Sequence, residues 1–190
     1  TDALVLTGRA VPAENPAPYR PLSEAFLGAL RDRPLPSDPR LAGFEGHLSR
    51  IVPGWGPAAA DESPVLVAEA LARLLSVLAD DGPSVLVLDD VHWADPETLD
   101  VVEYFRDALR GTTTLCICTA RPEGSADELL ARLDRPEPDG LVRIDPLADH
   151  AVGRMVSSCL QVADAPAGVA DFVTTHSDGN PFLVEELLAG

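Results

Sequence analysis

Two adjacent carboxylates, Asp89 and Asp90, end an apolar run that begins at Val85. The run is typical of a strand in a parallel sheet that is buried on both faces. Ligands bind at the carboxyl ends of such strands. One acid there can hold Mg²⁺, which takes few protein ligands and keeps its waters, and a second acid can polarise an attacking water. A solvated acidic turn is the alternative that these residues alone leave open.

Arg121 and Pro181 are further candidates for a binding site. Arg121 follows an apolar run over residues 114–119, and a guanidinium pairs with phosphate oxygens through two parallel hydrogen bonds. A surface arginine in a turn explains its position equally well. Pro181 follows a Gly-Asn pair and fits the first position of a helix, where proline is common. Position alone does not separate the binding role from the structural role for either residue.

The chain contains no lysine, and all 14 of its basic residues are arginine. The phosphate-binding loop G-x-x-x-x-G-K-[ST] needs a lysine that reaches the β- and γ-phosphates. That loop therefore does not occur within these 190 residues.

The three cysteines do not form a recognisable framework. An odd number without regular spacing indicates a reducing compartment, and we expect a cytoplasmic protein. Cys116 and Cys118 lie two apart in an apolar run, so they face the same side of a strand. We expect buried structural thiols there, because free cysteine is among the most buried residue types. A metal site would need more ligands nearby.

Composition excludes several classes of function. The net charge of −17 argues against nucleic-acid binding by this segment, because such binding requires a basic surface. No apolar run approaches the ~20 residues that span a bilayer, so no membrane contact is expected. The first residues lack a basic region and a cleavage pattern, so they are not a signal peptide. With 46% hydrophobic residues the chain can build a core.

Strands alternate with helices over the first three quarters of the chain, which favours a parallel α/β sheet. The predicted strands are residues 3–6, 84–90, 114–119 and 141–144. The predicted helices are 22–30, a short one near 41–51, 64–80, and one that starts at Asp95-Pro96 with Asp95 as N-cap. Beyond residue 146 we expect only helices, at 147–160, 166–176 and 182–189. The predicted domains are therefore 1–146, an α/β core, and 147–190, the start of a helical lid.

The segment Leu88-Asp89-Asp90-Val91-His92-Trp93-Ala94-Asp95-Pro96 closely resembles a signature of the signal-transduction ATPases with numerous domains (STAND). Within that class it is most similar to the ATP-binding module of large LuxR-type bacterial transcriptional regulators, which belongs to the AAA-like P-loop ATPases. Three other regions resemble the family in the same order along the chain. They are residues 7–10 with 18–22, residues 141–147, and residues 179–188.

The resemblance implies a role for each matching residue. Asp89 matches the Walker B aspartate that binds Mg²⁺, and Asp90 matches the catalytic second acid, which is Glu in many relatives. The shorter Asp puts fast hydrolysis in doubt. Arg121 matches the sensor arginine expected to contact the terminal phosphate, and Pro181 matches a proline that packs against adenine. ATP or ADP with Mg²⁺ is the implied ligand.

His92 and Trp93 fall in the turn after the two acids. We expect packing and hydrogen-bonding roles for them, because a single histidine is usually structural and a tryptophan fits the core. The alternative is that they position the moving part of a nucleotide switch.

The resemblance also implies a P-loop NTPase-like fold from which the first, central strand and the phosphate loop (Walker A) are absent. We favour a fragment of a larger protein over a remnant that lost its nucleotide site. Its partners would be other domains of the parent chain, with self-association as an option. Three functions stay open, namely a regulatory ATP/ADP switch, a working ATPase whose loop lies upstream, and an interaction scaffold that binds no nucleotide. No hydrolysis is expected from these residues alone.

Overall fold

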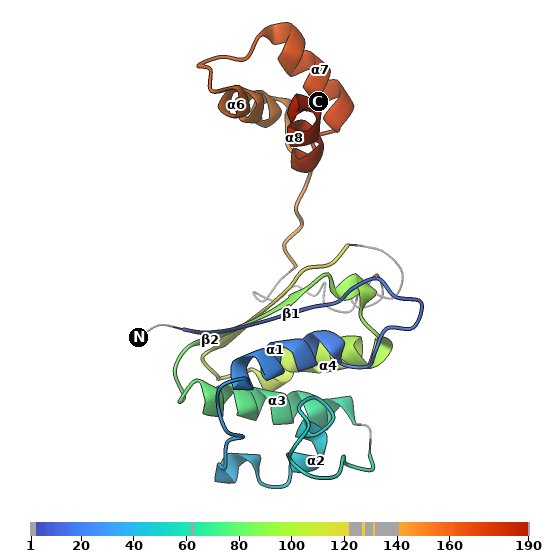
Figure 1. Cartoon of the computed structure of the whole chain (residues 1–190), viewed down its shortest axis with the longest axis vertical. Helices are drawn as coiled ribbons and strands as arrows, with labels where there is room; N and C mark the ends of the chain where they lie inside the picture. The colour runs from blue at the N-terminus through green and yellow to red at the C-terminus, as the bar shows by residue number, and fades with distance from the viewer. Residues whose placement is uncertain (1–2, 62, 122–126, 128–130, 132–140, 190) are drawn as a thin grey trace. The chain divides into compact units, whose positions relative to one another are not determined.

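The computed structural model of the chain describes all residues except 1–2, 62, 122–126, 128–130, 132–140 and 190 (Figure 1). The chain divides into two compact units, Thr1–Leu141 and Val142–Gly190. The division predicted from the sequence lies slightly later, at residue 146. Each unit is described by itself below.

The first unit contains a sheet whose strands are parallel, as predicted from the alternation of strands and helices, with three described strands where four were predicted. The strands are β1 (Leu4–Arg9), β2 (Ser84–Asp89) and β3 (Thr114–Cys118), and β2 lies between the other two. Val5 pairs with Val85, and Val85 pairs with Leu115. All three carboxyl ends therefore lie at one edge of the sheet, which is the edge where ligands bind in this architecture.

Helices cover one face of the sheet (Figure 1). They are α1 (Arg20–Leu30) and α4 (Pro96–Ala108), and α3 (Pro64–Leu78) packs against α4 on the side away from the sheet. Leu6, Leu86 and Leu88 point to this face and are almost fully buried. They join Phe26 of α1 and Phe105 of α4 in the main hydrophobic core. The apolar periodicity of the helices places these residues correctly from sequence alone.

The opposite face of the sheet is less buried among the described residues, and β2, predicted to be buried on both faces, is fully buried on one face and half-buried on the other. Val5 is 59%, Leu115 57% and Ile117 43% exposed. Val85 and Val87, which lie between them on β2, are half-buried. Residues at period two share a face of a strand, so these side chains form one apolar surface. We call these five residues the open face.

The predicted fourth strand over Leu141–Ile144 is absent, since residues 141–148 have no regular secondary structure. Val142 is 81% and Ile144 93% exposed. A parallel strand takes every ladder hydrogen bond from its neighbours. The outer edge of β3 pairs with no strand in the described part of the chain, so no described neighbour offers these residues a ladder. The apolar pattern is therefore present without the neighbour that would make it a strand.

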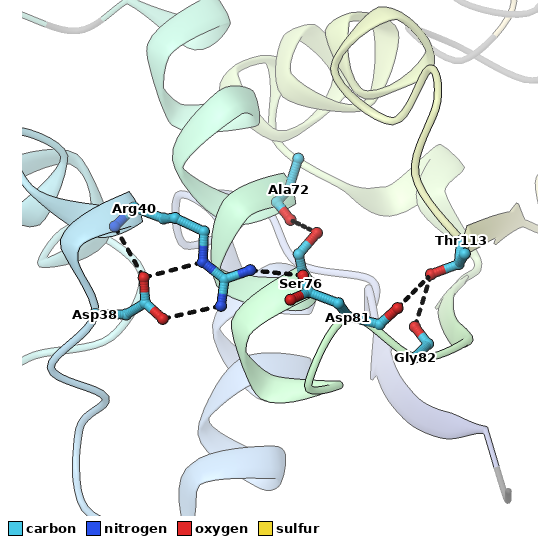
Figure 2. Close-up of polar contacts among 7 residues, drawn as sticks. All are labelled: Asp38, Arg40, Ala72, Ser76, Asp81, Gly82 and Thr113. Atoms are coloured by element: carbon cyan, nitrogen blue, oxygen red, sulfur yellow. Dashed lines mark hydrogen bonds and ion pairs between the residues drawn. The ribbon is translucent and has the colours of Figure 1, made fainter.

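A small block of short elements packs against α3, on the side of the sheet that the helices cover. It contains a 3₁₀ turn, η1 (Pro39–Leu41), and α2 (Glu45–Leu48). Figure 2 shows how Arg40 fastens it. The Arg40 guanidinium donates Nε to Asp38 Oδ1 and Nη2 to Asp38 Oδ2, each at 2.9 Å, and Nη1 to Asp81 Oδ1 at 2.5 Å. Because Asp81 precedes β2, Arg40 ties the block to the amino-terminal edge of the sheet.

The second unit is a group of three helices, as predicted. They are α6 (Asp149–Leu160), α7 (Ala167–Ser177) and α8 (Pro181–Ala189). Val152, Val156, Val173 and Val184 form its small core. Among the described residues of either unit, no helix combines the length and apolarity needed to cross a bilayer.

Candidate functional site

The site predicted at the carboxyl edge of the sheet brings three strand ends together. Arg9 and Asp89 are paired at the ends of β1 and β2. β3 ends at Cys118, and the ladder continues because Thr119 donates its N–H to the Leu88 carbonyl oxygen at 3.0 Å. Charged and hydroxyl side chains from three distant segments therefore meet at one place.

Asp90 is held by an arginine that the sequence did not single out. Arg9 donates Nε and Nη2 to Asp90 Oδ2, at 3.0 and 2.7 Å. The hydrogen bond to Asp90, followed by the charges of Asp90 and Asp89, raises the pKa of Arg9 above its ordinary value. Asp90 itself adopts a left-handed backbone with φ of 56°, which aspartate tolerates better than most residues. The turn thus directs its carboxylate back towards β1.

Thr119 links the two acids. Its hydroxyl donates to Asp89 Oδ1 in a short hydrogen bond. The Thr119 hydroxyl oxygen also accepts the backbone N–H of Asp90 at 2.9 Å. One threonine therefore orients the Asp89 side chain and the start of the following turn.

His92 and Trp93 lie in the 3₁₀ turn η2 (Val91–Trp93) that follows. Their rings are 4.5 Å apart between centroids and tilted by 45°. His92 is 8% exposed, and its Nδ1 accepts the backbone N–H of Arg121 at 3.3 Å. Packing and hydrogen bonding are confirmed for the pair. The structure also brings the predicted sensor residue Arg121 beside the turn that begins with Asp89 and Asp90, which we call the acidic turn.

Asp95 fixes the start of α4, as predicted for an N-cap. Its Oδ1 accepts the Thr98 N–H at 2.9 Å, and its Oδ2 accepts the Thr98 hydroxyl at 2.5 Å. Oδ2 also accepts the backbone N–H of Tyr19 at 3.1 Å. This buried carboxylate ties the loop between β1 and α1 to the turn that carries the candidate site.

Pro181 lies in the second unit, at the first position of α8. The preceding Gly179 has φ of +72°, and its carbonyl oxygen accepts the Leu147 N–H at 2.8 Å. A Cβ at residue 179 would stand 2.5 Å from the Leu147 carbonyl oxygen. Glycine is therefore required by this turn, and Pro181 has the helix-starting role expected from the sequence. Its predicted contact with adenine stays a prediction.

The acidic residues fit a magnesium ion better than a metal held by protein alone. No group of three or more metal-ligating side chains (His, Cys, Asp or Glu) occurs in the described ranges. Mg²⁺ normally takes one or two carboxylates and completes its shell with phosphate oxygens and water. Asp89, oriented by Thr119, would supply such a carboxylate at the carboxyl edge of the sheet.

The cysteines differ from their prediction. Cys116 and Cys118 share one side of β3, with their sulfurs 3.9 Å apart, as expected from their spacing. However, Cys116 is half-buried and Cys118 is exposed, so they are not buried core thiols. Shared hydrogen bonding lowers the pKa of Cys116 and raises the pKa of Cys118.

Arg9 and Thr119 are site residues that were not predicted from the sequence. Both end or follow strands that lie next to β2. Their position at the strand ends is a signal that can be used once the order of the strands is known, and Arg9 also lies in the family-like region 7–10.

Comparison with known proteins gives one match. A family model described as an AAA ATPase domain matches residues 1–118 of the chain. No curated protein and no solved structure matches it. The matched region includes all three strands and the acidic turn.

Proposed function

Because the chain belongs to the family of AAA ATPase domains, we propose that it is part of an ATP-responsive switch in a larger signal-transduction protein. The resemblance of residues 88–96 to the STAND signature points to the LuxR-type transcriptional regulators as the parent class. In this proposal the nucleotide sets the conformation of the parent, and hydrolysis is slow.

The observation that carries the proposal is the meeting of two acids and two arginines at one sheet edge. Asp89 and Asp90 end β2, Arg9 ends β1, and Arg121 is hydrogen-bonded to the same turn through its backbone. A carboxylate for the metal and a guanidinium for phosphate oxygens are the complementary groups that Mg²⁺-ATP requires. A turn that is acidic only because it faces solvent would need neither the hydrogen bonds of Thr119 to Asp89 and Asp90 nor the ion pair with Arg9.

Each residue then has a distinct task. Asp89 would hold the hydrated Mg²⁺, which when bound neutralises charge on the phosphates. Arg121 would contact the terminal phosphate. Asp90 would orient the attacking water, but its Oδ2 is occupied by Arg9. This ion pair holds Asp90 towards β1 and, together with the shorter side chain of Asp, supports a switch over a fast ATPase.

The phosphate loop must come from residues outside this sequence, since the chain holds no lysine. We propose that the elements carrying this loop add to the β3 edge of the sheet. The outer edge of β3 lacks a paired strand in the described ranges, and the open face is exposed. An added strand and helix there would bury Leu115 and Ile117, as both faces of parallel sheets are usually covered.

Nucleotide titration of the parent tests the proposal. Calorimetry should show Mg²⁺-ATP binding by the parent and no binding by residues 1–190 alone, because the amides and the lysine of the loop supply most phosphate contacts. ATP and ADP should give different patterns of limited proteolysis, with slow turnover. Rapid multiple turnover would favour the hypothesis of a working ATPase. A parent that binds no nucleotide would favour the hypothesis of an interaction scaffold. Micromolar affinity of residues 1–190 for Mg²⁺-ATP would contradict the proposal that the phosphate loop lies outside this sequence.

A further inference from the structure

His92 occupies the point where the backbone ladder between β2 and β3 comes to an end. Beyond the strands, Thr119 donates its N–H to the Leu88 carbonyl oxygen at 3.0 Å, and the Thr119 carbonyl oxygen accepts the Val91 N–H at 2.9 Å. The next inward N–H on this side belongs to Arg121, two residues later. It donates to the His92 imidazole at 3.3 Å instead of to a carbonyl. A side chain thus continues the ladder across the site.

The hydrogen bond fixes the tautomer of the neutral ring. Nδ1 accepts the Arg121 N–H, so it carries no proton, and a neutral imidazole then carries its proton on Nε2. Nε2 is buried and has no hydrogen-bond partner in the described part of the chain. Trp93 packs against the ring. The ring is therefore held by one hydrogen bond and one aromatic contact.

We infer that His92 is a positioning residue that couples the acidic turn to the sensor segment by holding the backbone of Arg121. The inference rests on the proposed function, in which Arg121 contacts the terminal phosphate. Any shift of the turn after Asp89 and Asp90 moves the imidazole, and with it the origin of the Arg121 side chain. Binding of the metal at the turn after Asp89 thereby changes the position of Arg121 at the terminal phosphate.

Two substitutions separate the hydrogen bond from the packing. His92→Phe keeps an aromatic ring against Trp93 and removes the acceptor. His92→Asn removes the ring but places its amide oxygen where Nδ1 lies, so it can still accept from Arg121. His150→Phe is the matched control, because His150 is exposed and lies on α6 in the second unit.

The first measurement uses the 190-residue chain and needs no nucleotide. Nitrogen-15 spectra should show His92 as the Nε2–H tautomer. The Arg121 amide should exchange with solvent about fivefold faster in His92→Phe, as expected for one lost hydrogen bond, and at the original rate in His92→Asn and His150→Phe. A protonated Nδ1, or equal exchange in all variants, would overturn the inference.

The second measurement uses the parent and its preference for ATP over ADP. His92→Phe should lower the ratio of the two affinities about fivefold, the change expected for one lost hydrogen bond, and His92→Asn should restore it. In an Arg121→Ala background His92→Phe should have no further effect, since a residue that acts through another is not additive with it. Additive effects would show a merely structural role and overturn the inference. A parent that binds no nucleotide would instead overturn the proposed function, whereas the tautomer and exchange measurements test the hydrogen bond independently of nucleotide.

Discussion

The two faces of the sheet have similar side chains and opposite surroundings. On the covered face Leu6, Leu86 and Leu88 are almost fully buried under α1 and α4, whereas Leu115 and Ile117 on the open face are about half exposed. Both sets belong to runs that are typical of buried strands. The difference shows that an apolar run indicates how much of a strand can be buried. The elements that pack around the strand determine how much of it is buried.

A matched pair of leucines should show the largest difference between the faces. Leu86→Ala removes a fully buried side chain and should lower the free energy of unfolding by about 2–5 kcal/mol. Leu115→Ala removes a side chain that is 57% exposed and should cost less than about 1 kcal/mol. Urea denaturation of both variants measures the two values. Equal losses would mean that the open face is covered in solution.

Gly8 tests how closely the covered face is packed. A Cβ at this position would stand 1.8 Å from the Pro21 carbonyl oxygen of α1. Because α1 would have to move away from β1, Gly8→Ala should cost about 1–3 kcal/mol. Gly28→Ala is the control within α1, where a Cβ meets nothing within 4 Å, and it should stabilise the helix by about 0.5–1 kcal/mol. Thermal unfolding of the two variants should move in opposite directions.

The acid sensitivity of the Arg40 contacts should give the smallest effect. Hydrogen bonds from Arg40 lower the pKa of Asp38 from 3.8 to about 2. A carboxylate with a lowered folded-state pKa contributes stability above its unfolded value, and this contribution is lost as the pH falls from about 4 to about 2. The difference in melting temperature between the unsubstituted chain and Asp38→Asn should therefore shrink across this window. Asp32→Asn, at an exposed position, controls for the change in charge, and a difference that stays constant down to a pH of about 2 would contradict the assignment.

Local patterns predicted most of the fold. The cap at Asp95, the helix start at Pro181, the longer helices of both units and three of the four predicted strands depend on nearby residues or on apolar periodicity, and these are confirmed. The strand predicted at 141–144 was wrong, and the second face is less buried than predicted, because both depend on neighbouring elements and not on the apolar run itself. When a segment with a strand pattern has no neighbouring strand, its backbone N–H and C=O groups form hydrogen bonds with water instead.

The candidate site was predictable only in part, for a related reason. The resemblance identified Asp89, Asp90 and Arg121 from the chain itself, and the structure brings all three to one edge. Arg9, Thr119 and the role of the His92 ring arise from contacts across strands distant in sequence. Such contacts follow from strand order, which periodicity does not supply.

The most direct test of the proposed nucleotide site is Asp89→Asn in the parent protein, compared with Asp90→Asn. Asn is nearly the same size as Asp but neutral, so the fold should persist while Mg²⁺ loses its charged ligand. We expect Asp89→Asn to abolish the Mg²⁺-dependent response to nucleotide, with at least about tenfold weaker Mg²⁺-ATP binding. Asp90→Asn should slow hydrolysis more than it weakens binding. If Asp89→Asn binds and responds to Mg²⁺-ATP like the unsubstituted parent, and both proteins melt alike, Asp89 only closes a turn and the nucleotide site is refuted.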